Sequence, residues 1–133
     1  MFEVRWSAVR VLRCLARPET LDGLAVPAEA RACRVASDEL LLIGGPAVVD
    51  LPDAMVVDEA GGWASLTLAG EGAGEAFGRL SALPVEPGWL QGVVAGVPAK
   101  AFVDGSEIQL LVAASHAHHV DERVRAACSD LLA

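Results

Sequence analysis

The stretch WASLTLAGEGAGEAFGRL, residues 63–80, joins two segments with different hydrophobic periods. Before Gly70, Leu66 and Leu68 alternate with more polar residues, and a period of two predicts a β-strand. After Gly70 the apolar residues recur at spacings of three and four, which predicts an amphipathic helix. The residues on this helical stripe are Ala73, Ala76, Phe77 and Leu80. A half-buried strand followed by a helix indicates a domain that combines sheets with covering helices.

The same signals assign elements to the rest of the chain. Before residue 63 they predict a strand at Val4–Leu15, a short helix from Pro18 to Gly23, strands at Ala32–Val35 and Leu40–Ile43, and one or two helical turns within Pro46–Asp53. After residue 80 they predict a loop carrying Trp89, one strand or a bent pair at Val93–Val103, a hairpin turn at Asp104-Gly105, a strand at Glu107–Val112 and a helix from Ser115 to about Leu132.

This order of elements predicts an α+β fold in two halves, residues 1–54 and 55–133, with antiparallel or mixed sheets and helices mainly on one side. Each half is expected to follow the order βαββα. Leu40–Ile43 is apolar at every position, which is typical of a central strand. We therefore expect this strand to have a neighbour on each side.

Length and composition narrow the class of protein. The chain has 133 residues, a net charge of −8 and 53% apolar residues. The acidic balance disfavours nucleic acid as a partner, because phosphate binding needs a basic surface. No segment reaches the ~20 apolar residues of a membrane span, and the N-terminus lacks a signal peptide's apolar block, so a cytoplasmic protein is expected. The high apolar content has two open explanations, a GC-rich genome or apolar surface that a partner covers.

The three histidines, His116, His118 and His119, raise the question of a metal site. On the predicted last helix, His118 with Glu122 could supply two ligands, and His116 with His119 two more on a different line. A metal needs three or four ligands that converge, and no residue completes either set. The histidines therefore predict the start of a capped helix with exposed imidazoles, and Ser115 is the expected N-cap.

Other catalytic patterns are also incomplete. GEGAGEAFG, residues 70–78, lacks the Lys-Ser/Thr of a phosphate-binding loop and the spacing of a dinucleotide fingerprint. Asp58 and Glu59 are adjacent in an extended segment and point to opposite faces. Ser115-His116 has no third group to orient the histidine. Cys14, Cys33 and Cys128 have no metal-like spacing and are interpreted as small apolar residues. We predict no catalytic, cofactor-binding or metal-binding residue in this chain.

Four segments, taken with their order and spacing, carry a resemblance to a known family. They are CRVASDELLLIG at 33–44, VVDEAGGWASLTLAGEGAGEAFGRL at 56–80, VVAGVPAKAFV at 93–103 and IQLLVAASHAHHV at 108–120. Together they resemble the gamma subunits of heterotetrameric sarcosine oxidases, within the wider group of glycine-cleavage T-protein-like, folate-associated proteins. The segment Ser37-Asp38-Glu39-Leu40-Leu41 occupies one pattern of the family, with Leu40 where the family has tryptophan, and Asp58, Leu66, Leu68, Gly70 and Leu80 fit a second pattern. The resemblance covers about Ala32–Leu132.

The resemblance implies one T-protein-like domain over residues 1–133, built from two ferredoxin-like halves of which the first is trimmed. It also implies a non-catalytic subunit of a bacterial oxidoreductase complex, in which flavin, NAD and tetrahydrofolate belong to larger partner subunits. His116 stands in the place of a packing aromatic. Trp63 and Trp89 are candidates for the partner contact, because tryptophan is enriched at interface hot spots. The alternatives are a stand-alone or self-associating module that binds folate or a similar ligand, and an independent enzyme.

Overall fold

The computed structural model describes Met1–Ala133 as two compact units. The large unit comprises Met1–Ala8 and Ala64–Ala133, and the small unit comprises Val9–Trp63. These units differ from the predicted halves 1–54 and 55–133, because residues 2–8 pair along their length with residues 64–70. The α+β class with two sheets is confirmed.

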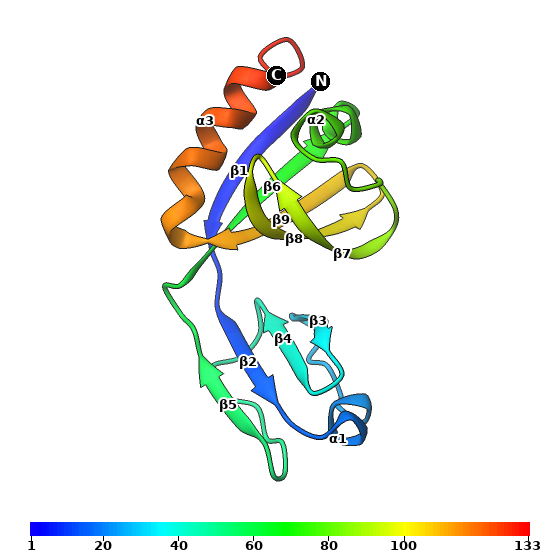
Figure 1. The fold of residues 1–133 in the computed structure, drawn as a ribbon, viewed down its shortest axis with the longest axis vertical. Helices are drawn as coiled ribbons and strands as arrows, with labels where there is room; N and C mark the ends of the chain where they lie inside the picture. The colour runs from blue at the N-terminus through cyan, green and yellow to red at the C-terminus, as the bar shows by residue number, and fades with distance from the viewer. The chain divides into compact units, whose positions relative to one another are not determined.

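The large unit is a five-stranded sheet with two α-helices (Figure 1). Its elements are β1 (Phe2–Ala8), β6 (Trp63–Gly70), α2 (Ala73–Leu80), β7 (Gly88–Val94), β8 (Val97–Asp104), β9 (Glu107–Ala113), the 3-10 turn η1 (Ala114–His116) and α3 (Ala117–Ala127). The strands lie in the order β1-β6-β9-β8-β7. The pairs β1–β6, β7–β8 and β8–β9 are antiparallel.

Strand β1 is fastened on both sides at its start. Phe2 lies opposite Gly70 of β6, and its own backbone N–H donates to Leu131 while its carbonyl accepts from Ala133. Gly70 has a φ of +122°, and a Cβ there would lie 2.7 Å from the Met1 carbonyl oxygen. Only glycine fits this backbone without strain. The end of the chain therefore covers the outer edge of β1 at Phe2.

One core joins both helices to the sheet of the large unit. The predicted stripe of α2 is fully confirmed, since all four of its residues are buried. They pack in the same cluster as Leu66 and Leu68 of β6 and as Val120 and Val124 of α3. The two helices therefore share one face of the sheet, as predicted.

The last helix is shorter than predicted and starts differently. Residues 114–116 form a 3-10 turn, so α3 begins at Ala117 and His116 takes the N-cap position without a side-chain cap. The prediction of Ser115 as N-cap is therefore wrong. The helix ends at Ala127, five residues before the predicted end at Leu132, and a turn follows. Val120 and Val124 of the helix, and Cys128 directly after it, are buried.

Two hairpin turns shape the second half of the sheet. The segment Val93–Val103 divides between β7 and β8 at a turn where Ala95 and Gly96 have φ values of 51° and 83°. The hairpin predicted at Asp104-Gly105 is confirmed, with Gly105 at a φ of 59°. Both turns use the left-handed backbone region that glycine adopts without cost. Trp89 lies in β7 and not in a loop, because the strand already starts at Gly88.

The small unit is a four-stranded sheet with one short helix (Figure 1). Its elements are β2 (Val11–Leu15), α1 (Pro18–Asp22), β3 (Arg31–Ala36), β4 (Glu39–Ile43) and β5 (Met55–Asp58). The strand order is β3-β4-β2-β5, so β4 has a neighbour on each side and the prediction of a central strand is confirmed. A core of Leu12, Cys14, Leu21, Leu40 and Leu42 packs on one face of this sheet.

Three predictions for the first half are corrected. Val4–Leu15 forms two strands in different sheets, because the chain stays extended while its pairing partner changes from β6 to β4 and β5. Residues 46–53 form no helix; Val49 and Leu51 pack instead on the small core, and two prolines flank them. Neither unit has the order βαββα: the small unit ends on a third consecutive strand, and the large unit has two additional strands.

No helix of the protein is both long enough and apolar enough to cross a membrane.

Candidate functional site

The three histidines engage separate partners. His118 is 86% exposed, and its Nε2 lies 2.9 Å from the Glu122 carboxylate one turn along α3. His119 Nε2 lies 2.9 Å from the carbonyl oxygen of Ala95. His116 lies at the junction of η1 and α3. No three His, Cys, Asp or Glu side chains gather closely enough to hold a metal ion.

His119 fastens the β7–β8 turn to α3. The Ala95 carbonyl faces the imidazole, and the Ala95 N–H donates to the carbonyl of Leu80 at 2.7 Å. A non-glycine residue with a φ of 51° needs such support, because the left-handed region strains a Cβ. The sequence pattern gave no sign of this contact, since Ala95 and His119 are distant along the chain. The imidazole therefore has a structural partner.

The most connected polar cluster of the small unit centres on Arg13. Its guanidinium donates to both oxygens of Glu59 at 3.1 Å and to Glu39 across β2 and β4. The hydrogen bond with Glu59 raises the pKa of Arg13 above its ordinary value, against the effect of burial. The Trp63 indole N–H donates to the same carboxylate at 3.0 Å. This cluster joins a cation to two anions and contains no nucleophile, so it stabilises the sheet.

The adjacent acids Asp58 and Glu59 diverge. Asp58 accepts a hydrogen bond from Arg10 at 2.7 Å, whereas Glu59 faces Arg13. Each carboxylate therefore has its own arginine, and they do not form an acid–base pair. The predicted opposite orientation of these two neighbours agrees with their separate partners.

Trp63 and Trp89, the predicted contact residues, are both half-buried. The polar edge of Trp63 is used within the small unit by Glu59. Trp89 packs edge-on against Phe102 of the neighbouring strand, with ring centroids 5.0 Å apart and planes at 61°. This is a favourable aromatic geometry. Each tryptophan therefore has an internal anchor and an exposed remainder.

A tryptophan that the sequence analysis did not single out ties β1 to α3. The Trp6 indole N–H donates to Asp121 at 2.8 Å, and Arg125 donates to the other oxygen of the same carboxylate at 3.0 Å. The hydrogen bond from Arg125 lowers the pKa of Asp121 most, and the hydrogen bond from Trp6 lowers it further. Asp121 and Arg125 have the spacing of a helical ion pair, which the sequence could have revealed. Trp6 lies 115 positions away from Asp121, and no local pattern could have revealed it.

The three thiols are fully buried. Burial raises the pKa of Cys14 and of Cys128 above the ordinary thiol value. A thiol held protonated and away from solvent is a poor nucleophile and a poor metal ligand. The interpretation of the cysteines as apolar core residues agrees with these positions.

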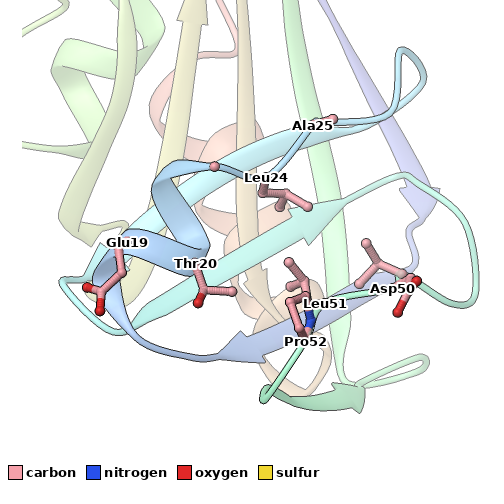
Figure 2. A pocket seen from close by; sticks show the side chains of 9 residues that line it. Glu19, Thr20, Leu24, Ala25, Asp50, Leu51 and Pro52 are labelled. Atoms are coloured by element: carbon pink, nitrogen blue, oxygen red, sulfur yellow. The ribbon is translucent and has the colours of Figure 1, made fainter.

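One hollow lies in the small unit and has a volume of about 360 Å³. Thr20 and Leu24 form one side, and Val49 and Leu51 form the other. Figure 2 shows that the carboxylates of Glu19 and Asp50 lie at opposite ends of this pocket, with the apolar side chains between them. The rest of the lining comes from Gly23, Ala25, Asp50 and Pro52. No basic side chain lines the pocket.

The wall that carries Glu19 is held in place by Arg34. Its guanidinium donates to Asp22 at 2.8 Å and to the Pro18 carbonyl at 3.3 Å, which are the two ends of α1. It also donates to the carbonyl of Ser37 at 2.6 Å. From the inside, Leu21 anchors α1 in the small core. These side-chain contacts add to the few backbone hydrogen bonds of a helix that is too short to be stable by itself.

A second hollow, of about 310 Å³, lies in the large unit beside the start of β1. Its walls include Val4, Leu132 and Arg125. The guanidinium of Arg125 is already bound to Asp121, and the end of the chain occupies the strand edge at Phe2. Glu3 and Ala133 complete the lining that these residues form.

Comparison with known proteins places the fold. No family model and no curated protein sequence matches the chain. Among solved structures, the heterotetrameric sarcosine oxidase of Corynebacterium sp. U-96, in complex with pyrrole 2-carboxylate, has a chain that superposes with a TM-score of 0.83. The match covers 97% of this chain and 84% of that chain, at 19% identity.

A more distant match is E. coli aspartokinase III in complex with lysine and aspartate. The TM-score is 0.50 at 14% identity, over 92% of this chain but only 32% of that chain. At these sequence identities a match shows the fold alone. The sarcosine oxidase chain superposes much more closely than the aspartokinase chain, as the two TM-scores show. The resemblance read from the sequence is confirmed at the level of the fold: this chain is folded like a chain of a heterotetrameric sarcosine oxidase.

Proposed function

We propose that this chain is a small, gamma-like subunit of a heteromeric sarcosine-oxidase-like complex, in the cytoplasm, and that its role is structural. The observation that carries the proposal is the superposition on a sarcosine oxidase chain over nearly the whole of both chains. A match of this extent differs from a shared motif, because both units are included. The partners are then larger subunits that carry the amine-oxidising chemistry.

The state of the polar side chains supports a non-catalytic role. The residues that the sequence offered as catalytic candidates serve as internal ties: His119 on a turn carbonyl, Glu59 on Arg13 and Asp58 on Arg10. Catalysis needs groups that converge on a space where a substrate fits. The pocket in the small unit has two acids at its ends, and its lining contains no histidine, cysteine, serine or lysine.

We further propose that flavin, NAD and tetrahydrofolate are bound by the partner subunits. These cofactors carry phosphate or carboxylate groups, and the only charged side chains of the 360 Å³ pocket are acidic. Like charges disfavour such ligands there. The proposal also gives a role to the apolar surface: seven large apolar side chains are exposed, and a partner would cover part of them.

Affinity capture of the chain from its native cells tests the proposal. A tagged chain is expected to co-purify with larger subunits in fixed stoichiometry, with flavin absorbance in the captured material. Recovery of the chain alone at physiological salt would contradict the proposed subunit role. Equilibrium dialysis of the purified chain against tetrahydrofolate tests the alternative of a folate-binding module. Saturable retention at micromolar concentration would favour this module over a structural subunit.

A further inference from the structure

The pocket of the small unit combines three properties that no internal role explains. It is concave, its middle is apolar, and the carboxylates at its ends, Glu19 and Asp50, form no hydrogen bond or ion pair within the chain. In contrast, the nearby Asp22 is paired with Arg34. Unpaired acids at the ends of an apolar hollow match a ligand that is cationic at its tips and apolar between them.

We propose that this pocket is the docking site for a basic segment of a partner polypeptide, in which lysine or arginine side chains are flanked by apolar residues. The inference rests on the proposed function and deepens it by naming the chemistry of the partner. An arginine or lysine stem would lie over Leu24 and Leu51, and its charged head would reach a carboxylate.

The surroundings favour a polypeptide over a small cation. Val26 directly follows the lining segment 23–25 and is 45% exposed, and Val48 directly precedes the lining segment 49–52 and is 78% exposed. A free amine would leave both valines in water. A peptide that extends past the pocket would cover them, and this burial of apolar surface would contribute to binding.

The pocket is pre-formed, which lowers the cost of docking. Arg34 holds both ends of α1, and Leu24, Val49 and Leu51 pack on the small core. A site whose walls are fixed before binding loses little conformational entropy when a partner arrives. The net charge of −8 also attracts a basic segment from a distance.

Titration of the ¹⁵N-labelled full chain with short blocked peptides tests the proposal without any partner subunit. The probe is acetyl-Leu-Arg-Val-Arg-Leu-amide, and the matched control carries citrulline in place of both arginines, which keeps the shape and removes the charge. We expect saturable shifts of the backbone amides of Thr20, Leu24 and Leu51 with the arginine peptide. The citrulline peptide is expected to bind at least about threefold more weakly, the size of one partly exposed ion pair.

Variants of the chain complete the test. Glu19→Gln with Asp50→Asn is expected to weaken the arginine peptide by about threefold to tenfold. The exposed pair Glu71→Gln with Glu86→Gln removes the same charge outside the pocket and is expected to change binding by less than twofold. Equal effects of the two pairs would overturn the proposal, because they would reflect net charge only.

Two further outcomes are decisive. If N-acetyl-arginine methylamide binds as tightly as the peptide, the pocket is a small-cation site and polypeptide docking is contradicted. If neither probe shifts the pocket amides at millimolar concentration, the docking site is wrong while the subunit role is untouched, because capture from native cells measures that role separately.

Discussion

Single residues in this protein mostly hold elements together across long sequence distances. Arg13 joins three neighbouring segments of the small unit, and Arg79 joins the end of α2 to the turn after α3 through Ala127 and Asp130. These long-range partners are 26 to 51 positions away, and Arg79 also pairs with Glu75 within α2. Charged side chains used in this way connect separate elements and stabilise a small fold.

The Arg13 cluster predicts that replacing Arg13 lowers the free energy of unfolding more than replacing Arg10 does. Arg13→Met keeps the apolar stem but leaves Glu39 and Glu59 without their shared cation, so we expect a loss of about 1–2 kcal/mol in the free energy of unfolding. Arg10 makes a single, more exposed ion pair, and Arg10→Met is expected to cost less than about 1 kcal/mol. Urea denaturation at pH 7 measures both, and equal losses would contradict the clustered role of Arg13.

Asp121 predicts how stability depends on acid. Its pKa is lowered in the folded state by Arg125 and Trp6, so near pH 4 the folded chain binds fewer protons than the unfolded chain. The stabilisation is complete above the unfolded pKa of about 3.9 and is lost as the pH falls through the lower folded value. Asp121→Asn keeps an acceptor for Trp6 but does not titrate.

We therefore expect the variant to be less stable at pH 6 and its disadvantage to shrink on acidification from about pH 5 to pH 3. Urea denaturation at several pH values provides the measurement. A difference between wild type and variant that stays constant over this range would show that Asp121 does not titrate differently in the two states.

At the level of elements, some glycines are required by the backbone conformation, whereas others could be replaced by alanine. Gly70 has a positive φ, and a Cβ there would approach the Met1 carbonyl to 2.7 Å. Gly74 lies within α2, and a Cβ there would meet no atom within 4 Å. The same residue type thus has opposite roles four positions apart.

Two alanine substitutions follow from this difference. Gly70→Ala is expected to destabilise the chain by about 2–4 kcal/mol, because strain and a backbone clash add at the β1–β6 pair. Gly74→Ala is expected to stabilise it by about 0.5–1 kcal/mol, since alanine favours the helix. Thermal unfolding followed by circular dichroism measures both changes. A loss of stability in the Gly74 variant would show that α2 is packed more closely there than the structure indicates.

The accuracy of sequence-based prediction also differs between elements, for physical reasons. β6 and α2 were predictable because their large buried apolar residues recur at a spacing of two in β6 and of three to four in α2, although Ser65 of β6 is buried as well. The change of sheet between β1 and β2 was not, because the chain stays extended and only its partners change. The helix predicted within residues 46–53 does not form, because Val49 and Leu51 pack on the small core. Local sequence does not reveal this contact.

The candidate site was predictable only in part. The prediction of exposed imidazoles is confirmed for His118, which is 86% exposed. The pocket could not be predicted, since residues 19–25 and 49–52 meet through folding of the small unit. The unpaired state of Glu19 and Asp50 likewise depends on where their neighbours lie in space.

At the scale of the whole molecule, the account describes a chain that acts through contact. Its thiols are buried and its pocket ends are acidic. Its fold matches a sarcosine oxidase chain over nearly the whole length. The proposed function is that such a chain contributes surface to an assembly while the reaction takes place on other subunits.

Sarcosine-dependent oxygen uptake, measured on the native assembly, on the larger subunits stripped of this chain and on this chain alone, tests that claim most directly. The account predicts uptake by the assembly, reduced uptake or dissociation of the stripped subunits with recovery when the chain is added back, and none by the chain alone. Oxygen uptake by the purified chain, or stripped subunits that remain assembled and fully active, would contradict it.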